Sequence, residues 1–331
     1  MQKNSESTPA PDKFVNERWS SVTSTPNPSG RSKKYIFTKP DCAVEASVRI
    51  GTSATDTIEI SCSTMCGCPM GCHFCGAGEY FVRSLTASEI VSQVQIILSN
   101  CREFETSLLT IRLISMGEPL LNSSLSTALS ELHNMYPNAK LGITTSAPRI
   151  DWTLVIQMGV SIPKLDLQFS VHHVTDQERD ALIPFKHKLT LEQISMVGHA
   201  WHESTGRKPS FNYCVLPSNS TESHASKILA LFPPDIWRAS ISVVASREHG
   251  SGVTYQSEHA LALDFSSRLA MLGYSLEVSD IGDLESIGGA CGQLWSVQEW
   301  FRANSKRARN SQGNRRRRTL HAQSTGMNYN L

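Results

Sequence analysis

The chain has 331 residues, of which 40% are apolar and 18% are charged, and its formal net charge is +1. This length can bury a substantial core, and the near-neutral charge by itself points to no class of partner. The first residues lack the apolar stretch of a secretory signal, and no run of about 18 apolar residues occurs, which excludes a membrane-spanning helix. The sequence therefore predicts a cytoplasmic protein without structural disulfides.

Residues 1–34 are rich in Ser, Thr, Pro, Asn and Lys, which predicts a poorly ordered lead-in. Further along, Thr86 and Glu89 have the spacing of a capping box that opens a helix. After this point apolar runs typical of strands alternate with helical spacing. The expected strands cover residues 107–114, 140–145, 165–170, 211–216, 239–244 and 275–278, and the expected helices cover residues 125–135, 152–158, 191–202, 222–231 and 258–272.

Strands that alternate with helices of this length indicate parallel pairing through right-handed crossovers. About six such units fit between residues 58 and 280, fewer than the eight that close a full barrel. The predicted fold is α/β, a partial (β/α)6 barrel like the TIM barrel, within a domain spanning residues 35–300. Active residues are then expected at the C-terminal ends of the strands.

Residues 301–331 form a predicted basic tail. From Arg302 to Arg318 it carries eight Lys or Arg residues and no acidic residue. Such a run is usually a solvated face or a mobile tail, and the sharper interpretation is contact with nucleic-acid phosphates. Both interpretations stay open.

The nine cysteines are unevenly distributed, with five of them inside fourteen residues. Cys68, Cys72 and Cys75 are separated by three and then two residues, a spacing that lets one loop present three thiolates to three irons of a [4Fe–4S] cluster. The fourth iron then has no protein ligand and can bind a substrate. A zinc site is the main alternative, but zinc usually takes two pairs of ligands and no second pair follows downstream.

The run from Cys62 to Val94 resembles the RlmN/Cfr group of radical S-adenosylmethionine methyltransferases, which modify adenosine in ribosomal and transfer RNA. Four further segments carry the resemblance in the same order, between about residues 42 and 300. They are residues 116–122 (MGEPLLN), 144–146 (TTS), 170–172 (SVH) and 290–294 (ACGQL). The resemblance implies a barrel of the radical S-adenosylmethionine type, with a [4Fe–4S] cluster and S-adenosylmethionine as cofactors.

The resemblance also implies the residues that hold the second cofactor. Gly117 and Glu118 would bind the amino end of S-adenosylmethionine. The remaining polar groups of the cofactor would be contacted by Thr144, Ser170, Val171 and His172. Taken alone, the Gly-Glu-Pro turn would be an ordinary strand-to-helix turn, and His172 an ordinary buried histidine.

Three catalytic residues follow from the same resemblance. Cys291, on a glycine-flanked loop, would receive a methyl group from one S-adenosylmethionine, and a radical made from a second would activate that methyl for addition to an electron-poor adenine carbon. Glu45 would remove the ring proton, although a strand-edge glutamate is an equal alternative. A second cysteine would free the product by forming a disulfide.

This sequence departs from the family pattern at the second cysteine. The family position, seven residues before Cys68, is Ser61, and Cys62 lies one position away. Cys62 is the candidate if the loop has slipped by one residue; otherwise it is structural, because a shift of one residue in a strand turns the side chain to the opposite face. The family's usual Asn after the late strand is also missing from residues 244–249.

Methylation of adenosine in ribosomal or transfer RNA is the leading functional hypothesis, with flavodoxin or ferredoxin as the electron donor. One alternative keeps the chemistry but acts on a small molecule, a nucleotide or a peptide. Another is a catalytically disabled relative that binds an iron–sulfur cluster or RNA. The sequence leaves the oligomeric state open, with a monomer as the simplest expectation.

Overall fold

The computed structural model describes residues 18–51, 57–101, 108–243, 255–279, 282–289 and 293–304. The strands are β1 (Ser21–Pro26), β2 (Ser32–Lys39), β3 (Cys42–Ile50), β4 (Thr57–Cys62), β5 (Met65–Gly67), β6 (Phe81–Ser84), β7 (Leu108–Leu113), β8 (Lys140–Thr145), β9 (Leu165–Ser170), β10 (Ser210–Val215), β11 (Arg238–Val243) and β12 (Leu276–Ser279). The helices are α2 (Ala87–Ser99), α3 (Leu125–Met135), α4 (Trp152–Ser161), α5 (Asp176–Leu182), α6 (Leu191–Thr205), α7 (Glu222–Leu231), α8 (Tyr255–Met271), α9 (Gly282–Glu285) and α10 (Trp295–Ala303), with short 3-10 turns η1 (Gly76–Glu79) and η3 (Pro119–Leu121).

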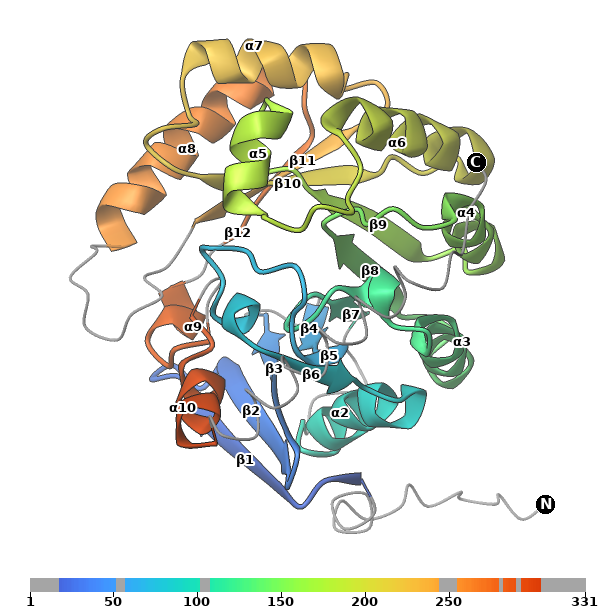
Figure 1. Cartoon of the computed structure of the whole chain (residues 1–331), viewed down its shortest axis with the longest axis vertical. Coiled ribbons are helices and arrows are strands. Elements are labelled where there is room, and N and C mark those ends of the chain that lie inside the picture. Colours follow the sequence, from blue (N-terminus) through green and yellow to red (C-terminus); the bar gives the residue numbers. More distant parts are fainter. Residues whose placement is uncertain are drawn as a thin grey trace, which may run out of the picture.

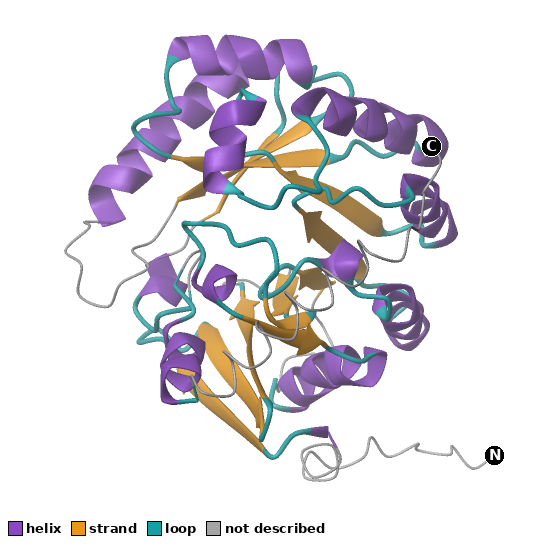
Figure 2. Ribbon diagram, in the orientation of Figure 1, coloured by secondary structure: helices purple, strands orange, loops and turns teal. Residues whose placement is uncertain are grey.

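Within the described residues, ten strands form one sheet in the order β1-β2-β3-β4-β7-β8-β9-β10-β11-β12. The strands from β4 onward are parallel, and β1, β2 and β3 pair antiparallel at one edge. Helices cover the outer face of the parallel part (Figures 1 and 2). The predicted α/β fold with an open parallel sheet is confirmed, and the expected strands match β7 to β12 within two residues.

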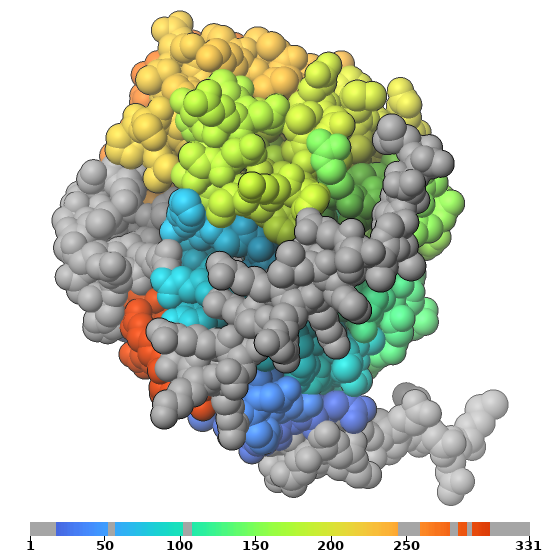
Figure 3. All heavy atoms as spheres, in the orientation of Figure 1, coloured from blue at the N-terminus to red at the C-terminus, as the bar shows by residue number. Residues whose placement is uncertain are grey.

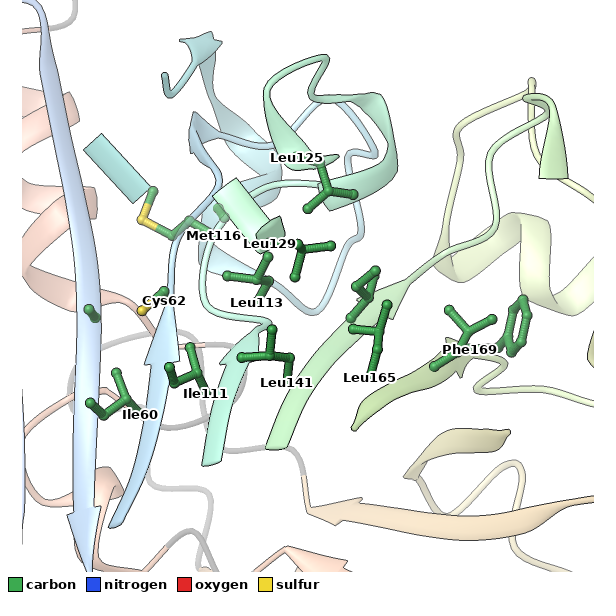
Figure 4. Packing of buried hydrophobic residues seen from close by; sticks show 14 of the residues in the cluster. Ile60, Cys62, Ile111, Leu113, Met116, Leu125, Leu129, Leu141, Leu165 and Phe169 are labelled. Atoms are coloured by element: carbon green, nitrogen blue, oxygen red, sulfur yellow. The ribbon is translucent and has the colours of Figure 1, made fainter. Parts of the chain in front are cut away.

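The parallel strands alternate between apolar and polar residues, and this alternation places the site. Ile58, Ile60 and Cys62 of β4 are buried on the outer face, while Glu59 and Ser61 face the inside. The same outer face carries the buried side chains of the next strands, such as Ile111 and Leu113 (Figure 4). The outer face is therefore the hydrophobic core beneath the helices, and the concave face is polar and free for chemistry.

Residues 18–34 do not form the poorly ordered lead-in that the sequence predicted. β1 pairs antiparallel with β2 from Ser21 opposite Thr38 to Pro26 opposite Lys33, and the buried Trp19 ring donates through Nε1 to Ser92 Oγ of α2 at 2.9 Å. The prediction is wrong here because β1 is an edge strand with exposed polar side chains, so its composition looks like that of a loop although its backbone is paired. Residues 1–17 lie outside the described residues.

The C-terminal helices lie against the N-terminal strands. α10 packs on β3 and α9 on β2, so segments far apart in sequence are side by side, as the orange-red and blue ribbons in Figure 1 show. The orange-red and blue atoms both lie in the lower part of the same view in Figure 3. α10 extends through Ala303, so the predicted tail does not begin at residue 301, and residues 305–331 lie outside the described part. Among the described helices, none is long and apolar enough to cross a membrane.

Candidate active site

A cavity of about 300 Å³ opens on the concave face, at the C-terminal ends of the parallel strands. Cys68, Cys72 and Cys75 all line it. Gly117, Glu118, Thr144, Ser170 and His172 line the same cavity, so the structure brings these five predicted cofactor-binding residues and the three predicted cluster ligands together.

The loop that carries the three thiols is closed by backbone contacts. The N–H of Cys68 donates to the carbonyls of Ala77 and Tyr80 at 3.0 and 2.7 Å, and the N–H of Cys75 donates to Cys72 O at 3.2 Å. Gly67 turns the chain into this loop with φ +76°, and a Cβ there would overlap the Tyr80 carbonyl. The cysteine loop therefore has a fixed shape before any cofactor binds.

The three cysteines are half-buried, and their thiols are close enough to influence one another. Burial is the main cause that raises the pKa of Cys68 and Cys72, and the neighbouring cysteines raise both further. Three thiolates cannot share this space without a compensating cation, which is what the irons of a cluster supply. The donor set therefore fits a [4Fe–4S] group.

Glu118 fastens the ends of β7 and β8 to each other. Its carboxylate accepts from Thr145 Oγ1 at 2.6 Å, from the Ser146 N–H at 2.7 Å and from the Leu120 N–H at 3.2 Å. Burial raises the pKa of Glu118 to about 7, and these hydrogen bonds oppose the rise. Gly117 precedes it with φ +101°, where a Cβ would lie 2.6 Å from Met65 Cβ, so only glycine allows this turn.

His172 is held in a strained conformation with φ +59°, uncommon for a residue with a side chain. Its Nδ1 accepts from the Cys214 N–H at 3.1 Å, and Phe74 meets its ring edge-on at 5.0 Å between centroids. Burial, and next the Arg179 charge, lower the pKa of His172 to about 3. The ring is therefore neutral and carries its proton on Nε2.

No family model matches the chain. A probable dual-specificity RNA methyltransferase RlmN of Thermus thermophilus is 27% identical over 288 residues, which are 83% of this chain and 77% of that protein. The protein of the same name from Thermotoga neapolitana is 30% identical over 238 residues, which are 70% of this chain and 67% of that protein. The chain belongs to the RlmN family of radical S-adenosylmethionine methyltransferases.

A solved structure has the same fold. A radical SAM methyltransferase from Sphaerobacter thermophilus superposes with a TM-score of 0.71 at 21% identity, over 85% of this chain and 84% of that one. Membership of the RlmN family makes this chain a methyltransferase that depends on a [4Fe–4S] cluster and S-adenosylmethionine. The thiols of Cys68, Cys72 and Cys75 fit the cluster, and the polar side chains that line the same cavity, such as Glu118 and Thr144, fit S-adenosylmethionine.

Cys62 is not part of the RlmN-type site. Its thiol is fully buried in the core on the outer face of β4, beside Ile60 (Figure 4), and burial alone raises the pKa of this thiol. Ser61 lines the cavity instead. The hypothesis that Cys62 acts at the site is therefore wrong, because Cys62 lies on the outer face of β4 and the neighbouring Ser61 is the residue that faces the cavity.

Val171 also points away from the cavity. Its side chain is buried in the hydrophobic core, and its N–H donates to Asn212 O at 3.0 Å. Val171 is not among the residues that line the cavity.

Glu45 lies on the concave face of β3 but not on the cavity wall. Its Oε1 accepts from the Val297 N–H at 3.1 Å, at the start of α10. Burial raises the pKa of Glu45 to about 7, and the charge of Lys34 opposes the rise. The role of Glu45 as a base stays a prediction.

Cys291 lies outside the described residues, as do residues 244–249. The residues on either side of Cys291 are placed, however, since both Gly289 and Leu294 line the cavity. The N–H of Trp295 donates to Gly288 O at 3.2 Å, which ties the two ends of this loop together beside the cavity.

Two arginines of the site were missed from the sequence. Arg112 of β7 spans the concave face, with Nε 2.7 Å from Glu59 of β4 and Nη2 3.0 Å from Glu277 of β12. A single arginine within an apolar strand was the available signal. Arg179 of α5 is the other, and nothing distinguishes it in sequence from the charged residues around it.

Proposed function

We propose that this chain methylates a carbon of adenosine in RNA, using Cys291 to carry the methyl group. The observation that carries the proposal is one cavity lined by three half-buried cysteines, Glu118 and His172, and also by Gly289 and Leu294, which flank residues 290–292 in sequence. Relatives named RNA methyltransferases support RNA as the substrate class.

Each residue at the cavity has a proposed task. Cys68, Cys72 and Cys75 would hold the [4Fe–4S] cluster. When bound and reduced, that cluster would supply the electron for radical cleavage of S-adenosylmethionine.

The second cofactor meets a fixed set of polar groups. The Glu118 carboxylate, held by three hydrogen bonds, faces the positive amino group of S-adenosylmethionine. Thr144 is oriented by its bond to Gln168 Oε1 at 3.0 Å, and neutral His172 presents Nε2–H as a donor. These groups are positioned before the cofactor binds, so little rearrangement opposes binding.

Cys291 accepts the methyl group in this proposal. Gly289 and Leu294, on either side of residues 290–292, line the cavity, and the Trp295 N–H donates to Gly288 O. A sulfur nucleophile is required because an adenine C2 or C8 carbon is electron-poor and cannot attack a sulfonium methyl itself. The thiolate can, by ordinary displacement. Breaking the later bond between the Cys291 sulfur and the transferred carbon would need a second thiol that forms a disulfide with Cys291, and Cys214 is another cysteine that lines the cavity.

Glu45 is proposed as the acceptor of the ring proton. Its pKa of about 7 lies where a carboxylate takes up a proton near neutral pH. Its carboxylate is bound to the start of α10, so this task requires α10 to release it.

Labelled methyl transfer tests the proposal. Anaerobically reconstituted protein, dithionite and S-adenosylmethionine with a deuterated methyl group are incubated with unmodified ribosomal and transfer RNA, and the nucleosides are analysed by mass spectrometry. We expect labelled methyladenosine with the wild type and none with Cys291→Ala. Cleavage of S-adenosylmethionine without labelled RNA contradicts the RNA substrate and favours a small molecule; no cleavage favours the disabled relative.

A further inference from the structure

Arg179 is a buried cation at the edge of the cofactor cavity. It comes from α5 and is only 1% exposed. Its guanidinium donates to Ser170 O from Nε at 3.3 Å and from Nη2 at 3.0 Å, to Leu189 O at 3.0 Å and to Ser146 O at 2.9 Å. All four hydrogen bonds therefore end on backbone carbonyls.

These carbonyls are at the strand ends that form the site. Ser170 is the last residue of β9, and Ser146 follows the last residue of β8; both line the cavity. The N–H of Leu189 in turn donates to Ala147 O at 2.8 Å. Arg179 thus joins the C-terminal ends of two neighbouring strands and a loop at the edge where the cofactors bind.

Arg179 makes no direct ion pair with a described residue. Asp176 accepts from the Leu191 N–H at 2.9 Å and Asp180 pairs with Lys188, so the charges of both carboxylates act on Arg179 only from a distance. Burial lowers the pKa of Arg179 to about 10, so it remains charged at neutral pH. A buried cation that makes no direct ion pair is costly, and an anionic group bound nearby lowers that cost.

The helix that carries Arg179 contacts the loop that carries the three thiols. The N–H of His73, between Cys72 and Cys75, donates to the carbonyl of Leu182, the last residue of α5, at 3.0 Å. Three thiolates around an iron–sulfur cluster would bring net negative charge to this place. Arg179 is therefore at the edge of the cavity in which that charge would lie.

We propose that Arg179 is a positioning residue whose buried cation, fixed on the carbonyls of Ser146, Ser170 and Leu189, stabilises the negative charge of the thiolate-bound cluster. The proposal rests on the proposed cluster site. It assigns Arg179 no contact with substrate, and its effect is on retention and reduction of the cluster.

Arg207 provides a matched control, because it contacts the other end of β9, the strand whose last carbonyl Arg179 binds. It donates through Nε to Leu165 O at 3.0 Å and through Nη2 to Gly159 O at 2.6 Å. Leu165 is the first residue of β9, so Arg207 makes the same kind of carbonyl contact at the opposite end of the strand. A purely structural arginine should behave like Arg207.

The experiment compares Arg179→Gln, Arg179→Lys and Arg207→Gln with the wild type after anaerobic reconstitution with iron and sulfide. Bound iron per chain, the cluster midpoint potential and the unfolding temperature are measured. We expect Arg179→Gln to lose iron and to shift the potential of any remaining cluster to more negative values, because a nearby positive charge favours the reduced form. We expect Arg179→Lys to stay near the wild type in both, and Arg207→Gln to lose stability only.

Two results would overturn the proposal. One is wild-type iron content and potential in Arg179→Gln; the other is loss of iron from Arg179→Lys as complete as from Arg179→Gln, which would make geometry rather than charge decisive. If Arg179→Gln does not fold, Arg179→Lys alone decides: iron content and midpoint potential near those of the wild type support the proposal, and loss of iron from folded Arg179→Lys protein overturns it. A wild type that binds no iron would instead refute the proposed cluster site itself.

Discussion

Ser61 and Cys62 are neighbours in β4 and point to opposite faces of the sheet: Ser61 lines the cavity, and the Cys62 thiol is buried among the apolar residues of the outer face. Ser61 pairs with Ser47 of β3 on one side and with Arg112 of β7 on the other, so its register is fixed from both directions. A slip of β4 by one residue would exchange the two side chains, and the pairing with strands on both sides opposes such a slip.

Replacing Cys62 should therefore change stability and not turnover. Cys62→Ala removes a buried sulfur and should cost about 1–2 kcal/mol of unfolding free energy, and Cys62→Ser should cost more because its hydroxyl has no partner in that core. Urea unfolding measures the cost, and methyl transfer per folded molecule should equal that of the wild type. A folded Cys62→Ala protein that accumulates a covalent RNA adduct would show that the buried thiol does reach the site.

Cys72 and Cys214 line the same cavity, which makes them a matched pair for cluster binding. Cys72→Ala should abolish reconstitution of the cluster, because one of three iron ligands is removed. Cys214→Ala should retain it, since Cys214 is not among the assigned iron ligands and its contact with His172 is made by its backbone N–H. Iron analysis and the visible absorbance of the cluster report both. Equal iron in the two variants would argue against the assigned ligands.

Cys291 should be found methylated. After coexpression with iron–sulfur assembly proteins, peptide mass analysis should show a methyl group on Cys291 in the wild type and at no other cysteine of the cavity. The control is the Cys72→Ala protein, which tests whether the modification needs the cluster. An unmodified Cys291 thiol in active protein would rule out the carrier role.

Glu45 should make the stability of the protein depend on pH near neutrality. Its folded-state pKa of about 7 exceeds the ordinary carboxyl value of 4.5, so the folded protein binds the proton more tightly than the unfolded chain. The contribution of Glu45 to stability is therefore full below about pH 4.5 and is lost as the pH rises through 7. Glu45→Gln should remove on the order of 2–3 kcal/mol from this pH dependence, measured by urea unfolding between pH 5 and 8. An unchanged pH profile would place the carboxyl in a more solvated environment.

The sequence predicted the local parts of this protein well. Periodicity located β7 to β12 and the cysteine spacing located the cluster loop, because both depend on residues close in sequence. The alternation in β4 also contained the answer for Cys62, since Ile58, Ile60 and Cys62 share one face.

What depends on long-range contacts could not be predicted. The hydrogen bonds of Arg179 join α5 to residues nine to thirty-three positions away, and the Arg112–Glu277 contact spans 165 positions. Placement of α10 against Glu45 is similarly remote, at 252 positions. β1 was missed for a different reason: an edge strand with polar side chains has no apolar alternation to detect.

Reductive cleavage of S-adenosylmethionine tests the central claim most directly. Anaerobically reconstituted wild-type protein should bind four irons per chain and, with dithionite, convert S-adenosylmethionine to 5′-deoxyadenosine, while Cys72→Ala should do neither. A wild type that takes up zinc in place of the cluster, or that binds iron and forms no 5′-deoxyadenosine, would contradict the account.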